Sequence, residues 1–159
     1  MWERLRRFSS QDPVARRTFL RAALLLPLIS VSLKVRGFRA TQQTLLRFPG
    51  PAQQVWQGDS IHLLSDDERT RLTVRMVNAA VRHVWRRSTC LEKSLVLWRL
   101  LERYGIASEL RIGARKRDGK FEAHAWVERQ GIAVDDPDDL HRHYAPFDGT
   151  LSTIPLEMR

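Results

Sequence analysis

The chain has 159 residues, of which 43% are hydrophobic, and this is enough for a domain with its own core. Its 27 Lys and Arg against 18 Asp and Glu give a formal charge of +9, which favours an acidic partner or surface without identifying it. A single cysteine excludes an internal disulfide and a multi-cysteine zinc site. We therefore expect a reducing compartment, the cytoplasm.

Residues 1–60 are predicted to form a helical N-terminal segment. Within it, Arg16 and Arg17 precede an apolar run at 22–33, as in an export signal. The run is shorter than the roughly 20 apolar residues that cross a bilayer, and basic residues follow where a cleavage site needs small ones. We predict instead a helix kinked at Pro27 that is buried or docked on a surface. Both a membrane and a partner protein fit such a helix.

The Pro-Gly-Pro stretch at 49–51 is the predicted linker to a second domain at 61–159. In that domain, Ser65 and Glu68 have the spacing of a capping box, and apolar residues follow at helical intervals. This pattern predicts a helix over about 66–84.

The only cysteine lies at the start of the next predicted helix. Thr89 and Glu92 have the spacing of a second capping box, so Thr89 is the expected N-cap and Cys90 the first helical residue, while Gly105 ends the helix. The positive end of a helix favours a thiolate and offers N–H groups to an oxyanion. Cys90 is therefore a candidate nucleophile, and the alternative is a small buried apolar side chain.

Strand-like runs joined at Asp118–Gly119 and near Gly131 predict an antiparallel meander after this helix. Alternation in the second run places His124 on the same face as Trp126. A histidine at such a position is more often structural. Together with Cys90, however, His124 is a candidate general base.

A third group that orients the imidazole could come from Asp135 or Asp136, which point to opposite faces of a strand. A two-residue turn at Gln130–Gly131 would place Asp135 on the face of His124. A three-residue loop with Gly131 in the left-handed position would place Asp136 there. Because glycine is the residue that this loop needs at its third position, we prefer the three-residue loop and Asp136.

The stretch CLEKSLVLWRLLERYGIASELRIGARKRDGKFEAHAWVE, followed by DD and YAPFD, resembles the leader peptidase (B protein) of lasso-peptide biosynthesis. The resemblance covers roughly residues 75–150, and the apolar N-terminal segment is similar to that of the stand-alone members. It implies an α+β fold of the transglutaminase-like, papain-related type. The family's Cys-His-Asp triad maps onto Cys90, His124 and Asp136, in agreement with the register argument.

The resemblance also implies a function and its partners. A peptidase of this family removes the leader from a ribosomally made precursor peptide, and an ATP-dependent cyclase then closes the macrolactam. No winged-helix pattern of strands is visible in 1–60, so we expect a separate leader-recognition protein. Cys90 would attack the scissile carbonyl, His124 would transfer the proton and Asp136 would orient His124. The Cys90 N–H would be one oxyanion donor, and the second is unassigned.

Two other classes of function are kept. A transglutaminase-like acyltransferase or cross-linking enzyme would use the same triad with an amine in place of water. A non-enzymatic basic module would use the positive charge, but no nucleic-acid motif accompanies it and we expect no nucleic-acid partner. Asp138, Asp139, His141 and His143 are interpreted as a polar loop, and we predict no metal and no cofactor.

Overall fold

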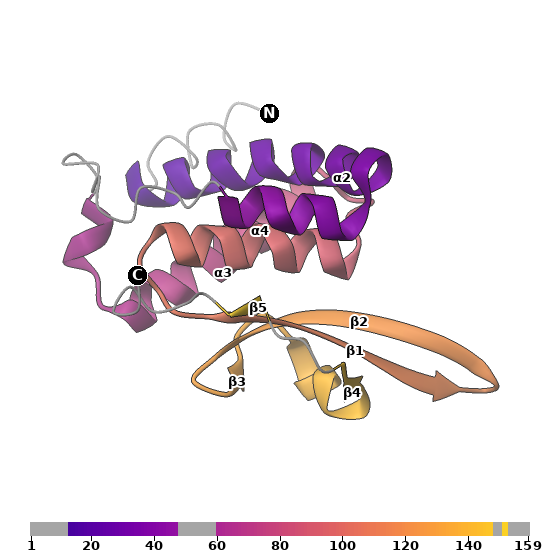
Figure 1. Ribbon diagram of the computed structural model, residues 1–159. Coiled ribbons are helices and arrows are strands. Elements are labelled where there is room, and N and C mark those ends of the chain that lie inside the picture. Colours follow the sequence, from indigo (N-terminus) through magenta and orange to yellow (C-terminus); the bar gives the residue numbers. More distant parts are fainter. Residues whose placement is uncertain (1–12, 48–59, 148–150, 153–159) are drawn as a thin grey trace.

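A computed structural model describes residues 13–47, 60–147 and 151–152, and it places a layer of helices against a curled antiparallel sheet (Figure 1). The helices are α2 (Pro13–Arg47), α3 (Asp66–His83) and α4 (Cys90–Arg103), with 3₁₀ turns η1 (Ser60–Leu63) and η2 (Pro137–His143). The strands are β1 (Glu109–Arg117), β2 (Lys120–Arg129), β3 (Ile132–Ala133), β4 (Ala145–Pro146) and β5 (Leu151–Ser152). The sheet order is β3-β2-β1-β4, and β5 also pairs with β1. The predicted α+β class is confirmed.

Both predicted capping boxes are present. Ser65 caps α3 through Glu68, and Thr89 caps α4 through Glu92. At α4 the Thr89 N–H donates to Glu92 Oε2 at 2.8 Å, and the Glu92 N–H donates to Thr89 Oγ1 at 3.2 Å. Cys90 is therefore the first residue of α4, as predicted.

The N-terminal helix changes direction at Gly37, whose backbone has φ 75° and ψ 176°. Its two parts lie side by side in Figure 1, and the hydroxyls of Ser32 and Thr41 are hydrogen-bonded across them at 2.8 Å. Pro27 lies inside the first helical part, where the backbone stays helical, and the kink expected there remains a prediction. Glycine tolerates positive φ without a Cβ clash, so the sharp bend falls there. The predicted linker at 49–51 lies outside the described residues.

The hydrophobic core lies between the helices and continues onto one face of the sheet. Helix α2 packs against both α3 and α4, and α4 also packs on β2. Tyr104, the C-cap of α4, joins the three helices: its hydroxyl is hydrogen-bonded to Thr18 at 3.0 Å, and its carbonyl accepts from Arg69 at 2.9 Å. The buried apolar side chains of this core include Ala22, Leu26, Ile29, Val77, Ala80, Leu95, Leu97, Trp98, Leu110 and Val127.

The meander predicted after α4 is present. β1 and β2 are joined by Asp118 and Gly119, which both have positive φ as a tight hairpin turn requires. This hairpin extends beyond the helices in Figure 1, and Phe121 near its tip is 81% exposed.

The turn between β2 and β3 differs from the prediction. Arg129 pairs with Ile132, so Gln130 and Gly131 form a two-residue turn in which both residues have positive φ. The predicted three-residue loop is wrong, because Gln130 adopts the left-handed conformation beside Gly131.

Candidate active site

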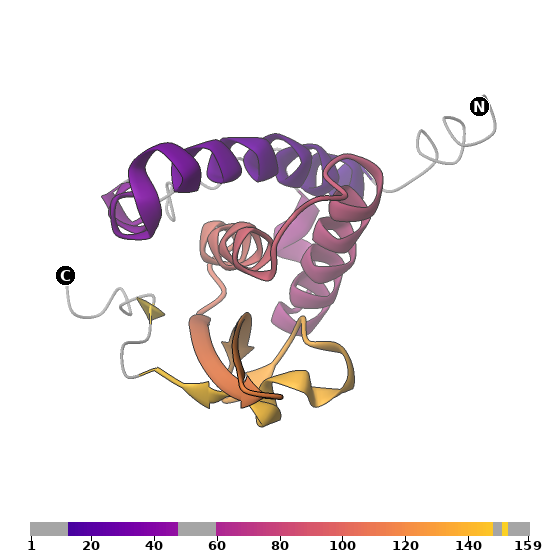
Figure 2. The same cartoon turned by 90° about the vertical axis from the view of Figure 1, so that its right-hand side faces the viewer.

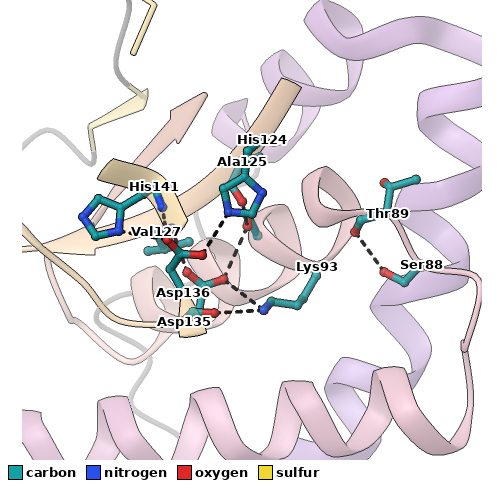
Figure 3. Close-up of polar contacts among 10 residues, drawn as sticks. Ser88, Thr89, Lys93, His124, Ala125, Val127, Asp135, Asp136 and His141 are labelled. Carbon is teal, nitrogen blue, oxygen red and sulfur yellow. Dashed lines mark hydrogen bonds and ion pairs between the residues drawn. The ribbon is translucent and has the colours of Figure 1, made fainter. Parts of the chain in front are cut away.

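His124 and Asp136 meet where the end of the meander enters η2, beside β2. His124 lies in β2, and its Nε2 is 3.0 Å from Asp136 Oδ1 (Figure 3). The Asp136 side chain is fully buried, and that of His124 is 16% exposed. Because an ionised carboxylate only accepts hydrogen bonds, this contact places the ring proton of neutral His124 on Nε2. The other ring nitrogen, Nδ1, has no hydrogen-bond partner among the described residues and is available as a base.

Asp136 is the residue preferred in the sequence analysis, although the turn that supported this choice is not present. β3 ends at Ala133, and the last backbone hydrogen bond of this edge runs from Val134 N–H to the Val127 carbonyl at 2.9 Å. Beyond it the chain leaves the strand and enters η2 at Pro137. Strict alternation therefore no longer decides where the two aspartates point.

Asp135 has a different set of partners. Its Oδ1 accepts the Val127 N–H at 3.0 Å, and its Oδ2 lies 3.4 Å from Ser94 Oγ and 3.6 Å from Lys93 Nζ. Lys93 also donates to the Asp135 carbonyl at 3.0 Å. Burial raises the pKa of Asp135, and the nearby Lys93 ammonium opposes this. Asp135 thus ties α4 to the end of the meander and does not contact His124.

Hydrogen bonds keep the Asp136 carboxylate ionised in spite of its burial. Burial acts to raise its pKa, but hydrogen bonds from the His141 backbone N–H and from the rings of His124 and His141 outweigh this effect. The pKa of Asp136 is therefore lowered from its ordinary value. A carboxylate that stays ionised can orient the imidazole of His124 and stabilise it when it becomes protonated.

Cys90 lies on α4 one turn before Ser94, so the two side chains lie on the same helix face. Ser94 Oγ donates to the carbonyl of Ala125 at 2.9 Å, which fixes this face of α4 against β2 next to His124. Cys90 is partly exposed and is not in a disulfide. No Cys90–His124 hydrogen bond occurs in the part of the chain that the structure describes. Such contacts in unliganded enzymes are often long and close only with substrate.

The start of α4 also offers backbone donors. The capping box satisfies the Thr89 and Glu92 N–H groups, whereas the first N–H groups of a helix have no intrahelical acceptor. Those of Cys90 and Leu91 are therefore directed out of the helix end beside the thiol. This arrangement suits a developing oxyanion.

His141 is a residue of the site that the sequence analysis interpreted as part of a polar loop. Its ring Nδ1 is 2.8 Å from Asp136 Oδ2, and its backbone N–H donates to the same oxygen. His124 and His141 approach Asp136 from two sides in Figure 3. The turn η2 brings His141 back to a residue five positions earlier, and no local spacing rule predicts this return.

Aromatic side chains enclose the His124 ring. Trp126 stacks near it with ring centroids 5.9 Å apart, and Tyr144 lies at 5.2 Å. Gly113 lies opposite His124 on β1, and a Cβ at this position would be 2.8 Å from the Ala145 carbonyl oxygen and 3.1 Å from Trp126. The site thus depends on the absence of a side chain at residue 113.

Over 13–47, 60–147 and 151–152, no three His, Cys, Asp or Glu side chains are grouped as metal ligands. The side chains of Asp138 and Asp139 lie outside the described residues.

A family model described as the transglutaminase-like superfamily matches residues 22–147. The chain belongs to the transglutaminase-like superfamily. This superfamily includes cysteine peptidases and acyltransferases and is usually enzymatic through a cysteine. The match begins within α2 and ends after β4, so it covers the helices, the meander and all the candidate site residues. Comparisons with curated proteins and with solved structures give no match.

Proposed function

We propose that this member of the transglutaminase-like superfamily is a cysteine peptidase with Cys90, His124 and Asp136 as its triad. The observation that carries the proposal is the hydrogen bond between His124 Nε2 and Asp136 Oδ1. It leaves Nδ1 as the basic nitrogen, while Ser94 holds the Cys90 face of α4 against the neighbouring residue of β2.

In the proposed reaction, Nδ1 of His124 takes the thiol proton as Cys90 Sγ attacks the scissile carbonyl. The Cys90 N–H stabilises the oxyanion. Collapse of the tetrahedral intermediate breaks the C–N bond, and His124 returns the proton to the leaving amine. Water, deprotonated by His124, then hydrolyses the thioester. Asp136 remains ionised and holds the ring throughout.

The substrate we propose is the leader–core junction of a lasso-peptide precursor. The resemblance of residues 75–150 to the leader peptidases of that pathway supports this choice. A separate leader-recognition protein would present the precursor, and an ATP-dependent cyclase would use the freed core N-terminus. All three partners would be met in the cytoplasm.

The test is a cleavage assay followed by mass spectrometry, with the precursor peptide and its recognition protein. We expect the wild type to yield leader and core with one added water. Cys90→Ala and His124→Ala should abolish cleavage, and Asp136→Asn should reduce it by about 100-fold or more. Circular dichroism of each variant checks that the fold is intact. Cleavage that persists in a folded Cys90→Ala protein would overturn the triad.

The same assay separates the peptidase from an acyltransferase. A primary amine is added as a competing acceptor, and the mass of the acyl product is read. We expect the water product to predominate. A product that carries the amine, formed only with Cys90 present, would retain the triad and replace the peptidase by an amine-using acyltransferase.

A further inference from the structure

The outer face of α2 carries a continuous row of exposed apolar side chains. Leu20, Leu24, Leu28, Val31 and Val35 are each at least 48% exposed. Their spacing of three or four residues places them on one face of the helix, over a length of about 22 Å. We call these five residues the α2 stripe. Other exposed large apolar residues in the described ranges, such as Leu63, Phe121 and Ile132, are on separate elements.

The opposite face of the same helix belongs to the core. Ala22 and Leu26 are fully buried, Ile29 is 3% exposed, and Thr18 is hydrogen-bonded to Tyr104. By length and composition alone, one helix in the described residues, at Pro13–Leu45, could cross a membrane. A helix that crossed a bilayer would have to withdraw Ala22, Leu26 and Ile29 from α3 and α4. The geometry therefore suits a helix that lies on a surface with its inner face still packed.

The charge of α2 identifies the kind of surface. Pro13–Arg47 contains arginines and a lysine but no aspartate or glutamate. Arg16 is exposed just before the α2 stripe, and Lys34, Arg36 and Arg39 are exposed at its other end. An apolar row with cations at both ends is complementary to acyl chains beneath anionic headgroups.

We propose that the α2 stripe docks this protein on an anionic lipid membrane, with the helix in the plane of the interface. Helix α2 lies on the side of α4 that is opposite to the sheet (Figure 2). Docking through the α2 stripe therefore leaves the sheet, which carries His124 on β2, on the side away from the membrane. The inference is independent of the proposed peptidase activity, because it uses no residue of that site.

The experiment is co-sedimentation of the full chain with vesicles of phosphatidylcholine alone or with about one-third phosphatidylglycerol. We expect binding to the anionic vesicles that weakens as salt rises, and much weaker binding to the neutral ones. Leu24→Ser combined with Leu28→Ser should weaken anionic-vesicle binding by more than about tenfold, since both side chains lose their apolar contact. Lys34→Glu combined with Arg36→Glu should weaken it by a similar factor.

Matched variants on the β1–β2 hairpin serve as controls. Phe121→Ser removes an apolar side chain that is even more exposed than Leu24 and Leu28, and Lys116→Glu with Lys120→Glu makes the same change in net charge as the charge variant of α2. We expect both controls to bind anionic vesicles within about twofold of the wild type. Three outcomes would overturn the proposal: no vesicle binding by the folded wild type, equal loss in the hairpin and α2 variants, or binding to the recognition protein that the leucine variants abolish while vesicle binding persists.

Discussion

Asp136 accepts two hydrogen bonds from His141, one from the ring Nδ1 and one from the backbone N–H, on the oxygen that does not face His124. The carboxylate that contacts His124 is thus itself fixed by His141 through its second oxygen. Its direction is set by η2 and not by the strand that precedes it.

Replacement of His141 should lower activity through Asp136. We expect His141→Ala to reduce kcat several-fold with little change in KM, because the carboxylate loses one of the donors that fix it. An asparagine amide can occupy the position of Nδ1, so His141→Asn should restore most of the activity. Peptide cleavage kinetics provide the measurement. His143→Ala, which changes an exposed histidine two residues later, is the control and should behave like the wild type. Equal activity of the Ala and Asn variants would contradict this role.

The two capping boxes allow a matched test of the α4 start. Thr89→Ala removes the N-cap side chain of α4, and Ser65→Ala removes that of α3. Each substitution should lower the free energy of unfolding by about 1 kcal/mol. Only Thr89→Ala should also reduce cleavage, because it loosens the turn that carries Cys90. Urea denaturation and cleavage rates measured on both proteins check this. A similar loss of activity in both would show that stability, and not the position of the thiol, controls the rate.

Gly113→Ala should disturb the site from the neighbouring strand. The new methyl would lie 2.8 Å from the Ala145 carbonyl oxygen and 3.1 Å from the Trp126 ring, so Trp126 or β4 must shift. We expect a loss of about 1–3 kcal/mol of stability and a clear drop in cleavage. Gly105→Ala is the comparison. An alanine at the positive φ of Gly105 should also cost about 1–2 kcal/mol of stability, but this residue lies just after the end of α4 that is far from Cys90. Unchanged cleavage in Gly113→Ala would refute this prediction.

The neighbouring aspartates should have opposite effects on the pH dependence of stability. The folded pKa of Asp136 is below its ordinary value of 3.8, so its stabilisation is present above that pH and is lost as pH falls through the folded pKa. The folded pKa of Asp135 is raised, so its contribution is largest below pH 3.8 and is lost as pH rises through the folded pKa.

The measurement is the unfolding free energy of Asp135→Asn and Asp136→Asn relative to the wild type from about pH 3 to pH 7. The deficit of Asp136→Asn should shrink toward acid pH, and that of Asp135→Asn should grow. Parallel pH curves for the two variants would show that the partners of Asp135 and Asp136 have been assigned wrongly.

Local sequence signals predicted the parts of this fold that depend on local interactions. The Ser65 and Thr89 caps, the end of α4 near Gly105 and the Asp118–Gly119 turn each involve residues within a few positions of one another. Each is decided by a side chain or backbone conformation that the sequence specifies directly.

The remaining features do not follow from the local spacing rules applied to the sequence. The rule that assigns Gly131 to a three-residue loop failed because Gln130 also adopts positive φ. Asp136 was preferred over Asp135 on the basis of that loop rule. Its contact with His124 arises instead because β3 is only two residues long and the chain then turns into η2. The bend at Gly37 and the return of His141 to Asp136 were not predicted from the sequence either.

The Tyr104 contact has a consequence for how this fold can be joined to other domains. Thr18, one turn into α2, is hydrogen-bonded to the residue that ends α4, so the two helices begin at opposite ends of the helical layer. A domain fused ahead of Pro13 would enter at the Tyr104 end of α4, about 20 Å along that helix from Cys90. A peptide held by such a fusion would need an extended segment of at least about six residues to reach the thiol. A recognition protein that binds beside the start of α4 has no such length requirement.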